Sequence, residues 1–231
     1  MSVLLLYLHL KGVFMRVAHG CFMLLFFVIV FSNCTNSVQE TNQPRIIGPD
    51  NSKYGFETGT MGWNVQTAGD SRACKSVSWS DSIVYSGAYS LEVDVSLLGG
   101  DTILSKGEVW VNMKENPPSG ISTPIDLSGK EICACVFTPP GSAGNMSRPN
   151  GLQLFVKDQQ WKSLYGSWKN NAAENWNHLN LTVNDTKPSG GWIDSGFDPT
   201  AIIAVGVKIA TGQGSSAIFN GTIHIDSIDW N

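Results

Sequence analysis

The chain has 231 residues, of which 42% are hydrophobic and 15% are charged, and its formal net charge is −4. So small a charged fraction disfavours a coiled coil or a charge-rich disordered chain, because globular proteins usually carry about 25%. The sequence also lacks the basic patch that nucleic-acid binding needs. The 24 glycines and 10 prolines favour short strands and many turns. The eight tryptophans exceed what a core of this size needs, and surplus tryptophan is typical of binding surfaces.

Residues 1–33 differ from the rest of the chain and predict an export signal. They contain no acid, and an apolar run over 21–31 follows Arg16, which is the pattern of such signals. The run is shorter than the ~20 residues that a membrane-spanning helix needs. It ends before Cys34 in a way that resembles a bacterial lipoprotein signal, so we expect lipidation of Cys34, with simple cleavage or an uncleaved anchor as alternatives. The polar residues 34–48 predict a flexible tether, and the protein is expected to be secreted or anchored at the cell surface.

From residue 49 to the end, apolar and polar residues alternate with the period of two that is typical of strands. Turn clusters rich in Gly and Pro separate these segments, and no segment has a sustained period of 3.6. The expected strands cover 89–97, 152–157, 179–183, 203–209 and 223–225. Many short strands with regular turns predict one all-β domain over 49–231, an antiparallel β-sandwich or jelly roll.

Three cysteines follow Cys34, namely Cys74, Cys133 and Cys135, and no CxxC pair occurs. Cys133 and Cys135 are two residues apart on an expected strand, so they share a face and are poorly placed to bridge each other. A bridge from Cys74 to either of them stays open, and buried free thiols are the favoured interpretation.

Catalytic motifs are largely missing from the sequence. It has no GxSxG nucleophile elbow and no HExxH zinc motif. Glu92 and Asp94 come nearest to the carboxylate pair of a glycosidase, but Ser96 stands where a third acid would complete an ExDxE array. We therefore expect a solvated strand face and no catalytic residues. A glycan-active hydrolase or lyase that uses Glu92, Asp94 or Lys157 is the alternative.

The tryptophans predict a sugar-binding surface. Trp161 and Trp168 bracket a loop that follows an expected strand. An indole ring offers a flat apolar face that matches the C–H face of a pyranose, while nearby amides and charges can bond its hydroxyl groups. We expect Trp161 to be the main platform, with Trp168 or Trp110 as a second, whereas Trp176 and Trp230 should be structural. The candidate sugar-binding residues are Trp161, Trp168, Trp110, Trp63, Gln153 and Lys157.

Five segments in register resemble carbohydrate-binding modules with a galactose-binding-like β-sandwich, over about residues 50–230. These segments are 54–63, 85–91, 126–130, 196–199 and 223–230. The segment 152–161 is similar to modules appended to β-mannanases and other plant-wall hydrolases. The resemblance implies non-catalytic binding of a β-mannan or β-glucan, by stacking on surface tryptophans and by hydrogen bonds. A cell-surface adhesion or assembly protein is a further alternative.

The same resemblance implies a structural Ca²⁺ that ties the first and last strands together. The Glu of the opening motif and the first Asp of the closing motif are typical ligands in such modules, and they correspond to Glu57 and Asp226 here. Backbone carbonyls near 86–88 could supply further oxygens, since Ca²⁺ takes about 6–8. Ser227 replaces the second Asp of the closing pair, and ordinary exposed acids are the alternative.

Overall fold

The computed structural model describes residues 50–99, 105–212 and 218–231. These residues form strands and no helix, which confirms the predicted all-β class. Within them there is accordingly no helix that is long and apolar enough to span a membrane. The predicted export signal, the tether and Cys34 lie outside the described residues.

The first sheet has the strand order β1-β4-β13-β8-β9-β12, and β10 also pairs with β8. Every pairing in it is antiparallel. Its strands are β1 (Asn64–Val65), β4 (Lys106–Asn112), β8 (Gly151–Asp158), β9 (Ser163–Tyr165), β10 (Lys169–Asn170), β12 (Trp192–Ile193) and β13 (Ile202–Ala210).

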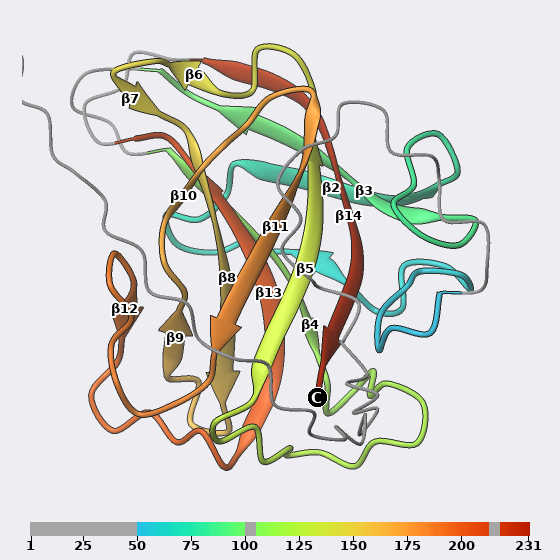
Figure 1. Cartoon of the computed structure of the whole chain (residues 1–231), viewed down its shortest axis with the longest axis vertical. Helices are drawn as coiled ribbons and strands as arrows, with labels where there is room; N and C mark the ends of the chain where they lie inside the picture. The colour runs from blue at the N-terminus through green and yellow to red at the C-terminus, as the bar shows by residue number, and fades with distance from the viewer. Residues whose placement is uncertain (1–49, 100–104, 213–217) are drawn as a thin grey trace, which may run out of the picture. The chain divides into compact units, whose positions relative to one another are not determined.

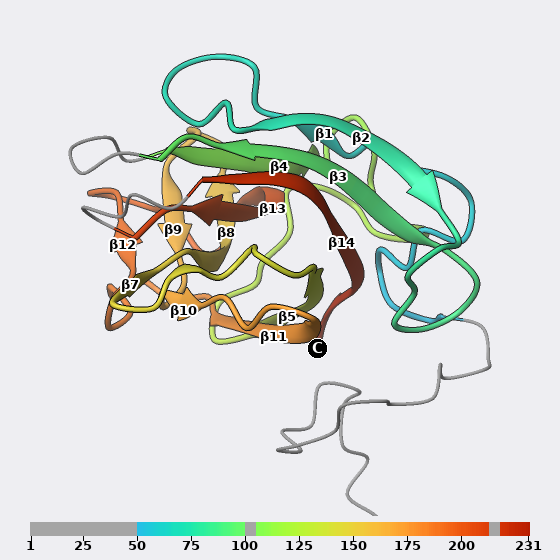
Figure 2. The same ribbon diagram turned by 90° about the horizontal axis from the view of Figure 1, so that it is seen from above.

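The second sheet has the order β11-β5-β14-β3-β2 and is also antiparallel. Its strands are β2 (Cys74–Ser80), β3 (Ser90–Leu97), β5 (Glu131–Thr138), β11 (Asn175–Thr182) and β14 (Phe219–Trp230), while β6 (Gly144–Asn145) and β7 (Arg148–Pro149) form a separate hairpin. In Figure 1, β5, β8, β11 and β13 run down the picture, whereas β2 and β3 run across it. Figure 2 shows the second sheet as one curved layer around the first.

The core lies between the inner faces of the two sheets. On the first sheet, the register aligns Val109, Val207 and Leu154, and all three are buried. On the second sheet, Leu91 and Val93 are buried in the same way. Because side chains alternate between the two faces of a strand, the residues between these point outward. The outer faces are therefore where the alternating pattern leaves polar and aromatic side chains for a site.

The expected strands are confirmed as β3, β8, β11, β13 and β14. β4 was not among the expected strands. Val109 is apolar, but its neighbours Glu108 and Trp110 do not form a regular polar face, and Glu108 is buried like Val109. β5 is buried along most of its length.

Two of the described cysteines are buried free thiols, as favoured from the sequence. These are Cys74 and Cys135, and burial raises the pKa of both, that of Cys74 to about 12. Neither is a nucleophile near neutral pH, because the thiolate is the reactive form. Cys133 is disulfide-bonded, so the free-thiol interpretation is wrong for this residue.

Candidate functional site

An aromatic row crosses the outer face of the first sheet. Directly paired residues of an antiparallel sheet point to the same face, so the register alone defines this line of side chains. It pairs each member with the next across β4, β13, β8, β9 and β12. The members of this aromatic row are Trp110, Gly206, Phe155, Tyr165 and Trp192.

The middle of the aromatic row is closed. A Cβ added at Gly206 would lie 2.4 Å from the Phe155 ring and 2.6 Å from the Cβ of Trp110, so only glycine leaves room for Phe155 here. The Phe155 ring also lies 5.1 Å from that of Tyr165 and is fully buried. The rings that a ligand can reach are therefore at the two ends of the row.

Trp161 lies at the Trp110 end of the aromatic row. The two rings meet edge-on with centroids 5.5 Å apart, and Trp161 is 50% exposed. Its φ of 65° is in the left-handed region that bulky residues rarely adopt. The buried carboxylate of Asp158 accepts hydrogen bonds from the N–H groups of Gln160 and Lys162, and the Trp161 N–H donates to the Asp158 carbonyl. This turn holds the indole ring outward.

A pocket of about 400 Å³ lies at the other end of the aromatic row. Trp192 is its most exposed ring, at 57%, and its indole N–H donates to Asp194. Trp168 lies against Gly151, where a Cβ would come within 2.1 Å of the ring. The lining residues are Lys106, Glu108, Gln153, Tyr165, Trp168, Gly190, Gly191, Trp192, Lys208 and Ala210.

Trp192 and Tyr165 were not among the predicted site residues. Trp192 directly follows the Gly-rich turn at 188–191, and β12 has only two residues, so no alternating pattern marked it. Tyr165 lies inside the loop that Trp161 and Trp168 bracket in sequence, in the three-residue strand β9. A turn signal directly before an aromatic residue was the available clue for Trp192.

The predicted polar residues Gln153 and Lys157 do share the outer face, but their polar groups are already engaged. Gln153 is 5% exposed; its Nε2 donates to the carbonyls of Gly166 and Gly190, and its Oε1 accepts from Lys208. Lys157 Nζ lies 3.9 Å from Glu108 Oε2. Gln153 therefore fixes the loops that bear Trp168 and Trp192, and its contact with sugar hydroxyls stays a prediction.

Glu108 is a buried acid on the outer face of the first sheet. Its Oε1 accepts hydrogen bonds from Ser71 Oγ at 3.0 Å and from the Tyr165 hydroxyl at 2.9 Å. Burial raises the pKa of Tyr165, and the negative charge of Glu108 raises it further. The phenol therefore stays protonated and fixes the ring of Tyr165 in the wall of the pocket.

Lysine side chains accompany every ring of the aromatic row. In each case the ammonium group lies 5.1 to 5.8 Å from a ring centroid, within the range of cation–π attraction. The pairs are Lys157 with Trp110 and with Phe155, Lys208 with Tyr165, and Lys187 with Trp192.

Trp63 is not part of a surface, so its predicted role in sugar binding is wrong. It is 2% exposed and meets the rings of Tyr54 and Phe56 edge-on in the core. Trp230 is buried, as expected of a structural residue. Trp176 is only half-buried and lies on the outer face of the second sheet, so it belongs to neither the core nor the aromatic row.

The residues of the catalytic alternative do not come together. Glu92 and Asp94 lie on β3 in the second sheet, where they accept hydrogen bonds from Ser78 and Ser76. Lys157 lies on β8 in the first sheet. Glu92 and Asp94 thus share one face of the second sheet, while Lys157 lies on the other sheet and cannot act with them on one bond.

Ser90, His224 and Glu92 form a line that is similar to a hydrolase triad. Ser90 Oγ lies 3.1 Å from His224 Nδ1, and His224 Nε2 lies 3.8 Å from Glu92. However, the Ser90 hydroxyl donates to the carbonyl of Ile83, and Ser90 is fully buried. A nucleophilic hydroxyl must give its proton to the base and be within reach of a substrate. The proton of Ser90 points to Ile83 and its oxygen is buried, so this line is structural.

The predicted calcium ligands approach the same loop. Glu57 Oε1 accepts from the N–H of Ala88, and Asp226 Oδ2 accepts from those of Tyr85 and Ser86. Burial, together with the nearby Asp50, raises the pKa of Asp226 to about 8, although these hydrogen bonds oppose the rise.

The carboxylates of Glu57, Asp226 and the nearby Asp50 are chemically suited to Ca²⁺, which prefers oxygen ligands. In arrangement, no three His, Cys, Asp or Glu side chains in the described part of the chain are grouped to hold a metal ion. The calcium site at Glu57 and Asp226 stays a prediction.

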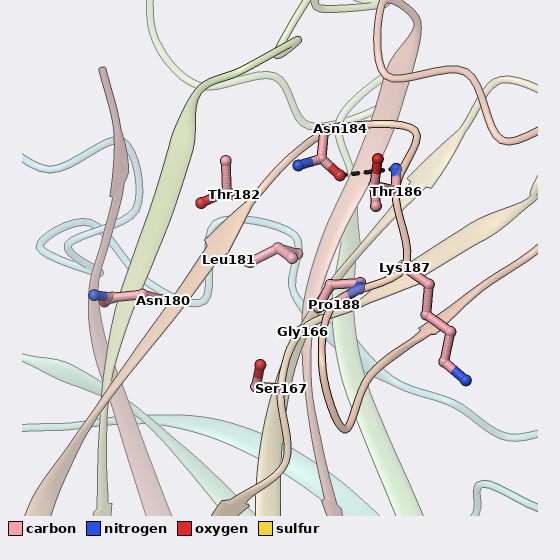
Figure 3. A pocket seen from close by; sticks show the side chains of 9 residues that line it. All are labelled: Gly166, Ser167, Asn180, Leu181, Thr182, Asn184, Thr186, Lys187 and Pro188. Atoms are coloured by element: carbon pink, nitrogen blue, oxygen red, sulfur yellow. Dashed lines mark hydrogen bonds between the residues drawn. The ribbon is translucent and has the colours of Figure 1, made fainter.

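A second pocket, of about 320 Å³, has no aromatic residue in its lining. Figure 3 shows Asn180 and Thr182 of β11 on one side and the turn at Asn184 and Thr186 on the other, with the Thr186 N–H donating to Asn184. Without a flat apolar surface, this pocket offers nothing for a sugar ring to stack on.

No protein-family model and no curated protein matches the sequence. Among solved structures, the chain is similar to one from a study of promiscuous specificity in carbohydrate-binding modules of the β-sandwich superfamily, with 20% identity and a TM-score of 0.51. That match covers 79% of this chain and 62% of the other, so the chain spans less than two thirds of that protein's length. The fold is thus that of β-sandwich carbohydrate-binding modules, as predicted.

Two further solved structures match at lower TM-scores. One is the xylan-binding module CBM15, with 16% identity, a TM-score of 0.42 and coverage of 72% of this chain and 88% of the other. The other is a carbohydrate-binding module from a study of specific mannan recognition, with 11% identity, a TM-score of 0.45 and coverage of 77% and 93%. At these TM-scores they add nothing to the assignment of the fold.

Proposed function

We propose that this chain binds a polysaccharide on the outer face of the first sheet and does not cleave it. The observation that carries the proposal is the pair of exposed indole rings at the two ends of the aromatic row, Trp161 at 50% and Trp192 at 57%. Large exposed aromatic residues beside a pocket mark binding sites.

The geometry around these rings supports a preformed site. Asp158 holds the turn of Trp161, Gly151 leaves room for Trp168, and Gln153 ties the carbonyls of both loops at the pocket. A ligand then meets rings that are already oriented, so little conformational entropy is lost on binding. Sugar rings would stack at the two ends of the row, and the polar side chains of the pocket would bond their hydroxyl groups.

The fold and the scattered acids support binding without chemistry. The likeness to β-sandwich carbohydrate-binding modules is one of fold, and the substrate class, a β-mannan or β-glucan, is the one that the resemblance of the sequence segments implies. Glycoside hydrolysis needs two carboxyl groups on either side of one bond. On the outer face of the first sheet, Glu108 is buried and bonded to Tyr165, and Asp194 is bonded to Trp192.

Affinity electrophoresis of the full chain in gels that contain β-mannan, β-glucan or xylan tests the proposal. We expect retardation by at least one glycan, its loss in Trp192→Ala, and no new reducing ends on prolonged incubation. Trp79→Ala is the matched control, because Trp79 is 43% exposed but lies on β2 in the second sheet. Migration that no glycan changes, or retardation that Trp79→Ala abolishes and Trp192→Ala does not, would overturn it.

We further propose that the protein is exported and carries lipid on Cys34, since a basic and then apolar leader precedes that residue. Such an anchor would hold the glycan-binding face at a cell surface, and simple secretion is the alternative. Mass spectrometry of the native N-terminus distinguishes them: a lipidated Cys34 is expected, and an unmodified or absent Cys34 would contradict the anchor.

A further inference from the structure

The lysines on the outer face of the first sheet carry information about the ligand, and this inference rests on the proposed function. Lys106 and Lys208 line the pocket, and Lys157 and Lys187 lie over rings of the aromatic row. Two acids are hydrogen-bonded to rings of the aromatic row: Glu108 to Tyr165 and Asp194 to Trp192. The chain as a whole has a net charge of −4, so the excess of lysine here is local.

Hydrogen bonds within the protein already engage both acids. Glu108 accepts from Ser71 and Tyr165 through one oxygen, and the other lies 3.9 Å from Lys157. Asp194 accepts from the Trp192 indole through Oδ1 and from the Ser163 N–H through Oδ2. Of the lysines on this face, only Lys157 is within ion-pair distance of either acid.

The remaining ammonium groups have donors to spare. The Nζ atoms of Lys106 and Lys187 donate no hydrogen bond to any residue that the structure describes. Lys208 Nζ donates to Gln153 Oε1 at 3.0 Å. An ammonium group has three donors, so Lys208 keeps two. Burial lowers the pKa of Lys208, which Glu108 opposes and the positive charge of Lys106 reinforces. An anion between Lys106 and Lys208 would offset the repulsion between their two ammonium groups.

The position of the ammonium groups over the rings separates neutral from acidic sugars. A neutral sugar that stacks on the side of the Trp192 ring where Lys187 lies would displace the ammonium group without replacing its electrostatic partner. A sugar that carries a carboxylate lets the same ammonium group move from the ring to a charge-assisted hydrogen bond. In a uronic acid the carboxylate is attached directly to the pyranose ring, so its charge stays beside the stacked ring, whereas a sulfate ester projects from a hydroxyl oxygen.

We propose that the polysaccharide bound by this face carries carboxylate groups, as a polyuronate does. Lys106 and Lys208 bind a carboxylate in the pocket, while a ring of the glycan stacks on Trp192. Lys187, which lies 5.8 Å from the Trp192 ring centroid, binds a carboxylate of a neighbouring sugar unit.

Matched oligosaccharides test this on the full chain. β-Linked mannan and β-linked mannuronate oligomers of equal length differ only in the oxidation of the exocyclic carbon, and β-glucan and β-glucuronate oligomers form a second such pair. By calorimetric titration we expect the uronate of at least one pair to bind about tenfold more tightly than its neutral partner at low salt. The preference should shrink from about 0.05 M to about 0.5 M NaCl, because salt screens exposed charges.

Two variants locate the effect. Lys106→Gln should lower the affinity for the uronate much more than the affinity for the neutral oligomer, and so remove most of the preference, while Trp192→Ala should weaken binding of both. Lys130→Gln, at an exposed turn before β5, is the matched control and should change neither. Loss of the preference in Lys130→Gln as well would mean that net charge, not the pocket, attracts the uronate, and would overturn the inference.

The outcomes separate this inference from the proposed function. Equal affinity for both members of each pair, with binding still lost in Trp192→Ala, would overturn the carboxylate and leave polysaccharide binding intact. Tighter binding of a sulfated mannan than of the mannuronate would also overturn it. No binding of any glycan, neutral or acidic, would contradict the proposed function itself.

Discussion

Both outer faces of the sandwich carry a line of paired side chains that begins or ends in a tryptophan, but only one of the two lines is open. On the first sheet the line is the aromatic row, which ends in the exposed Trp192. On the second sheet the register aligns side chains of β11, β5, β14, β3 and β2 in the same manner. The members of that second line are Trp176, Phe137, His224, Glu92 and Ser78.

The chain itself covers the second line. The ring of Tyr85, from the loop between β2 and β3, lies 5.3 Å from that of Trp176, and Ser90 bonds the carbonyl of Ile83 in the same loop. Trp79, the exposed indole on that sheet, has the ring of Tyr89 stacked on it at 3.8 Å. The comparison teaches that an exposed or outward tryptophan marks a binding face only where the chain does not already cover its ring.

The two faces also differ in charge. The aromatic row is accompanied by lysines, whereas the charged side chains of β3 are Glu92 and Asp94, bonded to serines of β2. A glycan with carboxylates would be attracted to the first face and repelled by the second.

The largest expected effect concerns the tryptophan that belongs to neither face. Trp63→Ala removes a buried ring that contacts Tyr54 and Phe56, and such core deletions cost about 3–5 kcal/mol of unfolding free energy. Urea unfolding monitored by circular dichroism measures it. A stability within about 1 kcal/mol of the unmodified chain would show that Trp63 is not a core residue.

Calcium, if it binds near Glu57 and Asp226, should affect stability and not glycan affinity. A ligand that binds only the folded state adds about 2.7 kcal/mol at a hundredfold excess over its dissociation constant. We expect addition of a chelator to lower the melting temperature of the full chain, and Glu57→Gln to abolish that difference. An unchanged melting temperature on chelation would contradict the calcium site.

The exposed tryptophans of the two sheets should differ in their contribution to glycan affinity. Trp192→Ala should cost about 2 kcal/mol, or roughly 30-fold, as for a binding hot spot. Trp79→Ala should leave affinity unchanged, because Tyr89 covers one face of its ring and its indole N–H is bonded to the Phe56 carbonyl. Calorimetric titration of both variants measures the difference, and equal losses would remove the distinction between the two sheets.

The smallest effect is expected at Trp161, where backbone strain can be isolated. Glycine adopts a positive φ without penalty, whereas alanine does not, so at the φ of 65° Trp161→Gly should be more stable than Trp161→Ala by up to about 1 kcal/mol. Thermal melts compare the two variants. A less stable glycine variant would mean that the turn held by Asp158 is not strained.

The sequence predicted the fold well because the alternating pattern depends on burial, and long strands such as β3 and β13 bury one full face. It located the site only in part. Trp161 and Trp168 follow a recognisable strand, but Trp192 joins the row through the register of β12 with β9, and pairing between distant segments leaves no local pattern. The predicted surface role of Trp63 was wrong, because a turn signal beside a tryptophan does not show which way the ring points.

The most direct test of the account follows the indole N–H signals of all eight tryptophans by NMR, each assigned through its Trp→Phe variant. The full chain is titrated with β-mannan oligomers and with the matched mannuronate. The account predicts that the signals of Trp161, Trp168 and Trp192 shift on binding, while those of Trp79 and Trp63 do not. A shift of Trp79 with the signals of Trp161 and Trp192 unmoved would place the glycan on the second sheet and contradict the central claim.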